Sequence, residues 1–388
     1  FINVLFSEFL IFDPNDPKWP GRDRFFLDPG HMSPMLYAQL SLIGKYSMQE
    51  LQQFRQWGSP TPGHPEVDVL RGVENTSGPL GQGHTFAVGA AIAAKFLAER
   101  LGWVMSQTIY AYISDGGVQE EISQGAGRIA GHLGLDNLIM FYDANNIQLS
   151  TKVDEVDTED VAMKYKAWGW HVLEVDGSSA SEIRKALAEA KSIVGKPTLI
   201  IGHTTMARGA VGADGTSYEG KVSTHGQPLS AAGASFEATV QNLGGDPNDP
   251  FRIFPEVEAM YQARLDVLRQ LAEERKKEEA LWRQDNKDRA EKLDRWFSGV
   301  SPVIDWSKVE QKPDQATRAA SATVLGVLAE QVENMIVASA DLSNSDKTDG
   351  FLKKTRALTR SDFGGAFLQP GVAELTMACL CIGMALHG

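Results

Sequence analysis

TIYAYISDGG (residues 108–117) and NLIMFYDANNI (residues 137–147) are two apolar segments that each end in polar residues. Unbroken apolar runs of this length are typical of strands that are buried on both faces of a parallel sheet. A segment with helical periodicity, QEEISQGAGRIAGHLG, separates them at residues 119–134. The order strand, helix, strand predicts a β-α-β unit, which places the chain in the α/β class.

The same alternation continues on both sides of this unit. It predicts helices over residues 85–100, 157–168 and 179–195, and strands over residues 170–177 and 197–204. We expect Asp157 or Thr158 to cap the second of these helices, because both side chains can accept a hydrogen bond from a backbone N–H. Together these elements predict a parallel sheet with helices on both faces. Ligands of such sheets bind beyond the carboxyl ends of the strands.

The rest of the chain predicts a linker and a second α/β unit. A glycine-rich loop over residues 206–235 is followed by a highly charged helical segment over residues 255–297, which we expect to be a solvated surface. The later elements are a helix over 316–331, a strand over 335–346 and a helix from residue 370. We therefore predict a first domain over residues 1–250, a helical linker over 251–312, and the start of an incomplete second domain over 313–388.

Composition and charge exclude several classes of protein. The chain has 388 residues, a net charge of −13 and two cysteines. Such an acidic chain repels nucleic acid and anionic membranes, and so few cysteines fit a reducing cytoplasm. No apolar run reaches the ~18 residues of a membrane span, and no basic segment precedes the apolar stretch at Phe1. We expect both ends of the sequence to be cuts through folded structure.

Polar residues at the ends of the two central strands predict a phosphate and metal site. Gly116 lets the backbone approach an anion, and N–H groups at a helix start attract it. The Asp115 carboxylate, the Asn145 amide oxygen and the Ile147 carbonyl could surround a Mg²⁺ ion that bridges the phosphates. A tight turn after a strand gives the same short pattern, so these residues alone leave both interpretations open.

Eight motifs in sequence order decide between these interpretations, because the whole set resembles transketolases. They are RDRFFLDPGH (22–31), TPGHPE (61–66), GPLGQG (78–83), the pair Asp115 and Asn145, STHGQPL (223–229), ATRAAS (316–321), SADLSNS (339–345) and GVAEL (371–375). The resemblance implies the parallel-sheet thiamine-diphosphate-binding fold. The first domain would bind the diphosphate, and residues 313–388 would begin the pyrimidine-binding domain. The chain would then be the N-terminal portion of a transketolase that is truncated at both ends.

The resemblance also implies a role for each matched residue. For the cofactor, it implies diphosphate contacts for His31 and Gly116, a wall against thiamine for Gly78, Pro79 and Leu80, and metal ligation for Asp115, Asn145 and the Ile147 carbonyl. For the substrate, it implies catalysis and binding for His64 and His225, and sugar-phosphate binding for Arg318 and Ser345. Glu374 would protonate the aminopyrimidine N1′. His225 and Glu374 would also contact the cofactor. Without the motifs, Glu374 would be an ordinary charge in the first turn of a helix, and Arg318 an ordinary surface cation.

The activity implied is the transfer of a two-carbon ketol unit from a ketose phosphate to an aldose phosphate, as in the pentose phosphate pathway of carbohydrate metabolism. The implied cofactors are thiamine pyrophosphate and Mg²⁺, with Ca²⁺ or Mn²⁺ as substitutes, in a cytoplasmic homodimer whose active sites lie at the interface. No nucleic-acid or membrane partner is expected.

The alternatives are a related thiamine enzyme such as a deoxyxylulose-phosphate synthase, or a non-catalytic or split cofactor-binding subunit. Three departures concern the surroundings of the site. Ser114 stands where the family has Gly, and Gly125 stands where it has a relay Glu. GVAEL (371–375) keeps Glu374 but lacks the Arg and the His of the family's GVREH.

Overall fold

The computed structural model describes residues 1–388, except for the side chain of Lys308. Its centre is a parallel sheet of five strands in the order β1-β2-β3-β5-β4. The strands are β1 (Arg24–Leu27), β2 (Ile109–Ser114), β3 (Leu138–Ala144), β4 (His171–Asp176) and β5 (Thr198–His203). Every neighbouring pair is parallel, and the register pairs Ser114 with Asp143 at the carboxyl ends of β2 and β3. The predicted α/β fold class is confirmed.

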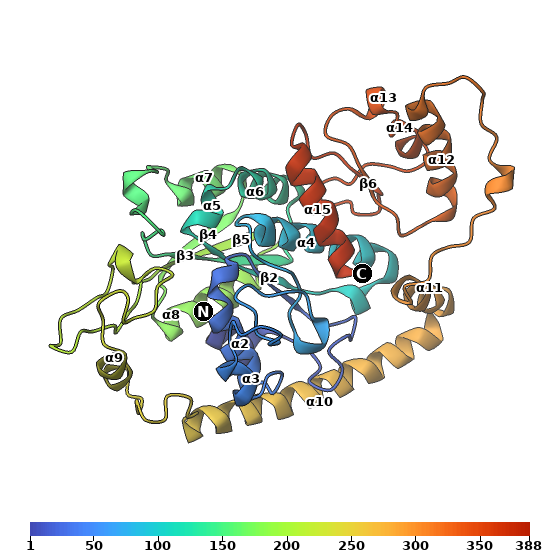
Figure 1. Ribbon diagram of the computed structural model, residues 1–388. Coiled ribbons are helices and arrows are strands. Elements are labelled where there is room, and N and C mark those ends of the chain that lie inside the picture. Colours follow the sequence, from blue (N-terminus) through green and yellow to red (C-terminus); the bar gives the residue numbers. More distant parts are fainter.

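Alternate side chains of the central strands enter two separate cores. Ile109, Ala111 and Ile113 of β2 pack with the helices α4 (Gln82–Leu101) and α6 (Glu121–Leu133) on one face. Tyr110 and Tyr112 point to the opposite core, which contains residues of α2 (Ser33–Leu42) and α8 (Ala180–Ala190). This alternation is that of a sheet covered on both sides, and Figure 1 shows the helices lying on the two faces.

The remaining helices are short or lie outside the sheet layers. The α-helices are α1 (Ile2–Val4), α3 (Met48–Gln52), α5 (Asp115–Gln119), α7 (Val161–Ala167), α9 (Phe236–Asn242), α10 (Pro255–Asp285), α11 (Lys287–Phe297), α12 (Thr317–Gln331), α13 (Ser343–Asp346), α14 (Asp349–Leu352) and α15 (Glu374–His387). Single π or 3₁₀ turns lie at Leu5–Phe9, Gly30–Met32, Val69–Arg71, Trp103–Met105, Val153–Glu155, Val222–Thr224 and Trp306–Lys308.

Three local expectations were wrong. The cap of α7 is Asp160, whose carboxylate accepts the N–H of Met163 at 2.8 Å, and neither Asp157 nor Thr158 caps the helix. The helix expected over 119–134 is interrupted at Glu120, which has an extended backbone between α5 and α6. The strand expected over 335–346 is reduced to β6 (Val337–Ala338), which pairs with β7 (Phe367–Leu368).

The charged segment after residue 255 is more than a solvated surface. It forms α10, which runs along one side of the molecule in Figure 1. Tyr261 and Leu268 of α10 are buried in the second core of the sheet domain, and Lys276 forms an ion pair with Asp13 at 2.6 Å. The linker helix is therefore fastened to the first domain by both apolar and ionic contacts.

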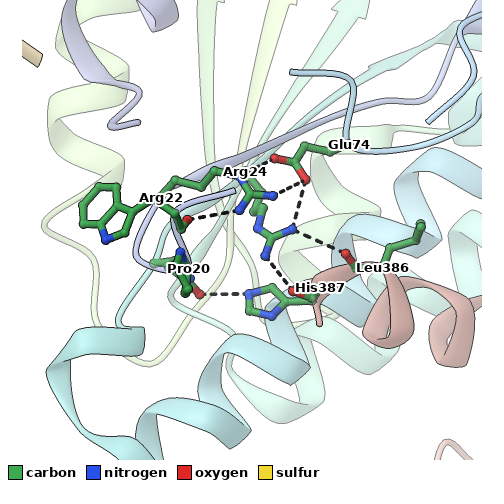
Figure 2. A network of polar contacts seen from close by, with 8 residues as sticks. Pro20, Arg22, Arg24, Glu74, Leu386 and His387 are labelled. Carbon is green, nitrogen blue, oxygen red and sulfur yellow. Dashed lines mark hydrogen bonds and ion pairs between the residues drawn. The ribbon is translucent and has the colours of Figure 1, made fainter. Parts of the chain in front are cut away.

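The last helix, α15, is packed against the first domain. It crosses α4 closely, because a Cβ at Gly89 would overlap the Leu380 carbonyl and a Cβ at Gly383 would overlap the Phe86 carbonyl. Figure 2 shows the polar network at its end, where Arg24 of β1 donates to the His387 carbonyl at 2.6 Å. The buried Glu74 carboxylate accepts from Arg24 at 3.0 Å and from Arg22 at 2.9 Å. The Arg24 guanidinium, itself paired with Glu74, thus holds the carbonyls at the end of α15 against the first strand.

Candidate functional site

A cavity of about 660 Å³ opens beyond the carboxyl ends of the central strands. Its walls come from the ends of β2, β3 and β5 and from the loops around His31, Leu80 and His225. Parallel sheets bind their ligands at this edge, and a cavity of this volume accommodates a cofactor. The structure therefore gathers most of the residues predicted for the site in one place: His31, Leu80, Asp115, Gly116, Asn145, Ile147 and His225.

The Asp115 carboxylate lies at the centre of the polar wall. Its Oδ1 accepts the hydroxyl proton of Tyr142 at 2.6 Å, and its Oδ2 accepts the backbone N–H of Asn145 at 3.2 Å. Burial raises the pKa of Asp115, while these hydrogen bonds oppose the rise. Helix α5 contains only the five residues from Asp115 to Gln119. Its dipole is therefore weak, and the backbone N–H of Gly116 would contribute more to the binding of an anion.

The chain turns back toward Asp115 after β3. The Asn145 Oδ1 accepts the backbone N–H of Ile147 at 3.0 Å, and Asn146 between them has a positive φ of 63°. This Asx turn fixes the Asn145 amide oxygen and the Ile147 backbone beside the Asp115 carboxylate.

The donor set fits a Mg²⁺ ion that is shared with a phosphorylated ligand. Each carboxylate or amide oxygen has a further lone pair beyond the one its hydrogen bond uses. Among the described residues no three His, Cys, Asp or Glu side chains cluster as they would in a site made of protein ligands alone. A site with one carboxylate, one amide and one carbonyl needs oxygens from a diphosphate and from water to complete an octahedral shell.

Asp143 and Thr204, which belong to the same wall, were not identified from the sequence. Asp143 at the end of β3 accepts the hydroxyl proton of Tyr112 at 2.8 Å and is hydrogen-bonded by Thr204. Its charge contributes to the raised pKa of Asp115. The register of β2 and β3 could have indicated Asp143, because it pairs with Ser114, the residue before Asp115.

His31 and His225 lie side by side in the cavity wall, with ring centroids 5.3 Å apart. Burial and the neighbouring His225 and His64 lower the pKa of His31 to about 4. Burial also lowers the pKa of His225, although a hydrogen bond to the backbone of Ile147 opposes this. Both rings are therefore neutral at pH 7, and each can accept or donate a proton at a ligand oxygen.

His64 lies beside this pair but outside the cavity lining. Its side chain is exposed, and its Cδ2 would lie 2.7 Å from a Cβ at Gly30. Gly30 therefore leaves the space that His64 occupies next to His31.

The segment Gly78-Pro79-Leu80 forms one side of the site, although only Leu80 lines the cavity. A Cβ at Gly116 would lie 2.8 Å from Leu80 Cδ1, so Leu80 can lie this close to the backbone of residue 116 only because that residue is glycine. The turn continues through Gly81, whose φ of 81° favours glycine. Behind it, the buried Asp28 carboxylate accepts the backbone N–H of His84 at 3.1 Å and so fixes the start of α4. Burial raises the pKa of Asp28 to about 6.

Three predicted residues lie away from this cavity. Glu374, Arg318 and Ser345 are exposed, on α15, α12 and α13, and none of them lines it. One chain alone therefore does not bring the residues predicted in its second domain to the residues predicted in its first.

These features define a class: an α/β protein with a ligand cavity at the carboxyl ends of a parallel sheet, lined by groups that suit a phosphorylated ligand. Residues 1–302 match the family model for the transketolase thiamine diphosphate binding domain, and the chain belongs to this family. Among the described residues, no helix is long and apolar enough to cross a bilayer.

Individual relatives agree with this assignment. The chain is 38% identical to a transketolase from Geobacillus stearothermophilus, over 99% of this chain and 58% of the relative. A solved transketolase from Leishmania mexicana superposes with a TM-score of 0.91 at 34% identity, covering 99% of this chain and 57% of that one. A transketolase from Pichia stipitis in complex with sedoheptulose 7-phosphate gives a TM-score of 0.90 at 33% identity, with coverage of 99% and 58%. The chain therefore spans somewhat more than half the length of these relatives.

Proposed function

We propose that this protein acts as a transketolase and moves a two-carbon ketol unit from a ketose phosphate to an aldose phosphate. The observation that carries the proposal is the cavity at the strand ends, where Asp115, Asn145 and Ile147 converge beside Gly116 and Leu80. The relatives of this chain are named transketolases, and one of their structures holds a sugar phosphate.

Thiamine diphosphate, when bound, supplies a thiazolium ring that stabilises a carbanion, which no side chain can do. In our proposal the N–H of Gly116 and the ring of His31 contact the diphosphate. Asp115, Asn145 and the Ile147 carbonyl hold Mg²⁺, for which Ca²⁺ or Mn²⁺ could substitute. Leu80, supported by Gly78 and Pro79, forms the apolar wall beside the thiamine.

The substrate would lie on the open side of this cofactor. We assign His64 and His225 to the hydroxyl and carbonyl oxygens of the sugar, where imidazole rings can hold or release protons. Arg318 and Ser345 would bind its phosphate, because a guanidinium offers a bidentate fork to phosphate oxygens.

Glu374 would hold a proton at the aminopyrimidine N1′. Since Glu374, Arg318 and Ser345 do not line the cavity of their own chain, they would serve the cavity of a second copy. We therefore propose a homodimer with two sites at its interface, in a cytoplasmic enzyme of the pentose phosphate pathway.

Product analysis on the intact protein tests the activity. With Mg²⁺ and thiamine diphosphate, we expect transfer from sedoheptulose 7-phosphate to an aldose phosphate, and no CO₂ release from pyruvate. Release of CO₂ from pyruvate without ketol transfer would instead show a synthase of the deoxyxylulose-phosphate type. Absence of both reactions in a protein that binds the cofactor would support a non-catalytic subunit.

A further inference from the structure

A second cavity lies between the first domain and the unit that follows the linker. It has a volume of about 640 Å³ and is separate from the cavity described above, with which it shares no residue. Its walls come from the end of α4, from α11, from the end of α12 and from the chain after α14. Figure 1 shows the chain leading from α11 through a long loop to the unit that contains α12 and α14.

Cationic side chains dominate the polar part of this cavity. Five of them line it, namely Arg100, Arg289, Lys292, Lys354 and Arg356, whereas Glu333 is the acidic residue of the lining. Three carboxylates neutralise part of this charge. Glu333 pairs with Lys292 at 2.7 Å, Asp362 pairs with Arg356 at 3.0 Å, and Glu330 pairs with Lys354. Two more cations than carboxylates remain, in a chain whose net charge is −13.

The two cations without a carboxylate partner differ in what they can do. Arg100 donates to the carbonyls of Phe363, Gly364 and Gly365 at 3.0–3.1 Å, which fixes the loop that forms one wall. Arg289 is exposed and, among the described residues, has no carboxylate within ion-pair distance. Arg289 is therefore free to bind an anion, while Arg100 supports the wall and adds its charge.

Positive charge is also concentrated at the Gly364 wall. A Cβ at Gly364 would overlap the Arg356 guanidinium, so this group lies directly over the backbone whose carbonyl Arg100 holds. Burial lowers the pKa of Arg100 to about 10 and the charge of Arg356 adds to this effect, whereas Glu99, Glu333 and Asp362 oppose it. An anion placed between these guanidiniums would relieve their repulsion.

The opposite part of the cavity is apolar. Trp296, Ala329, Val332, Phe351 and Ala366 line it, and Trp296 is half-buried with part of its ring accessible. An indole face is suited to stacking against a planar heterocycle. A bare phosphate or a short sugar phosphate would leave this surface without a partner.

We propose that this cavity binds a nucleoside polyphosphate. The phosphates would contact Arg289, Lys354 and Arg356, and the base would stack on Trp296. A cavity of this volume is large enough for a nucleotide. A long nucleic acid is disfavoured, because the surrounding surface of this acidic protein repels an extended polyanion. The proposal does not depend on the transketolase activity, since no residue assigned to catalysis lines this cavity.

Titration of the intact protein with MgATP, followed by calorimetry, tests the proposal. We expect the double variant Arg289→Ala/Arg356→Ala to bind MgATP at least about tenfold more weakly than the wild type, because two hydrogen-bonding charges are removed. The matched control is Arg295→Ala/Lys353→Ala, which removes two exposed cations, one in α11 and one directly after α14, that lie outside the cavity lining. This control should bind as the wild type does, and thermal unfolding should confirm that both variants are folded.

A second measurement examines the base. The wild type should bind MgATP more tightly than magnesium tripolyphosphate, and Trp296→Ala should remove this difference. Equal affinity of the Arg289→Ala/Arg356→Ala variant and the wild type would overturn the proposal, because ATP would then bind elsewhere, for example in the first cavity. Equal wild-type affinity for ATP and tripolyphosphate would overturn the nucleotide assignment, as would the absence of any binding.

Discussion

At the scale of single residues, the metal assignment rests on Asp115. Asp115→Ala removes the one carboxylate that we assign to Mg²⁺, and the amide and carbonyl that remain carry no charge. We expect calorimetry to show that Mg²⁺-dependent binding of thiamine diphosphate is abolished in the intact protein. Tyr142→Phe is the control, because it removes the 2.6 Å hydrogen bond to Asp115 but keeps the carboxylate. Unchanged cofactor affinity in Asp115→Ala would show that the cation is held elsewhere.

A second prediction concerns Glu374. Glu374→Gln keeps the size of the side chain but removes the acid that we assign to the aminopyrimidine N1′. We expect the variant to bind cofactor normally while H/D exchange at the cofactor C2 slows by roughly two to four orders of magnitude, the range of general acid–base catalysis. Leu375→Gln, an exposed position next to Glu374 on the same helix, should exchange as the wild type does. Wild-type exchange in Glu374→Gln would remove this residue from the mechanism.

Residue types at strand ends were predictable where a local rule applies. Asp115, Asn145 and Ile147 follow two apolar strands, and adjacent parallel strands place their carboxyl ends together. Asp28 and Asp143 were missed because their importance depends on pairing between distant segments, as in the bond from His84 to Asp28. The positions of Glu374 and Arg318 relative to the cavity also depend on tertiary packing, which motifs do not encode.

At the scale of secondary-structure elements, the crossing of α4 and α15 depends on two glycines. Gly89→Ala and Gly383→Ala each place a methyl group on a backbone carbonyl of the facing helix. We expect each to lower the free energy of unfolding by roughly 1–3 kcal/mol, as measured by denaturant titration, because the helices must separate. Gly326→Ala in α12 is the control, since no atom lies nearer than 3.6 Å to its Cβ, and helix propensity predicts no loss of stability. Equal effects at all three glycines would show that the crossing is not tightly packed.

The start of α4 should give the protein a defined dependence on pH. His84 is fully buried, and burial lowers its pKa to about 3 from the ordinary 6.5. Between these values the unfolded chain binds a proton that the folded chain does not, so stability falls as the pH is lowered. From pH 6.5 to pH 5.0 we expect His84→Leu to lose about 2 kcal/mol less stability than the wild type.

The same denaturant titrations at several pH values measure this difference. Asp28 acts in the opposite direction, because its raised pKa of about 6 lets the folded state take up a proton before the unfolded state does. The contribution of Asp28 is the same in the wild type and in His84→Leu if the variant keeps the hydrogen bond from the backbone N–H of residue 84 to Asp28. It then cancels when the two proteins are compared. Parallel stability curves for the two proteins would show that His84 is protonated in the folded state.

Long elements were predictable because their apolar pattern repeats over many residues, as in α4 and β3. The four residues of β1 were not predicted as a strand, because Arg24 and the short apolar run give no clear period. The break at Glu120 and the reduction of β6 to two residues depend on neighbouring loops and not on local propensity. Tertiary contacts therefore decided the shortest elements.

At the scale of the whole molecule, α15 is joined to the first strand of the sheet, β1. Arg24 holds the C-terminal carbonyls of α15, and the strand that carries Arg24 leads directly to Asp28 and His31 at the cavity. The opposite end of α15 carries Glu374. The network in Figure 2 therefore fixes the distance between the cavity of a chain and the acid that we assign to the cavity of its partner. Sequence motifs identified both ends of this arrangement, and the packing of α15 on α4 keeps Glu374 out of the cavity of its own chain.

This separation allows a test in which two inactive proteins restore each other. If each site combines Asp115 of one chain with Glu374 of its partner, a heterodimer of Asp115→Ala and Glu374→Gln contains one site with both mutations and one with neither. Mixing the two variants under conditions of subunit exchange should then give about a quarter of wild-type ketol transfer, since half of the dimers are mixed and each has one intact site. If both residues served one site within a chain, every site in the mixture would carry a mutation. The mixture would then be as inactive as its components, and the assignment of Glu374 to a neighbouring subunit would be wrong.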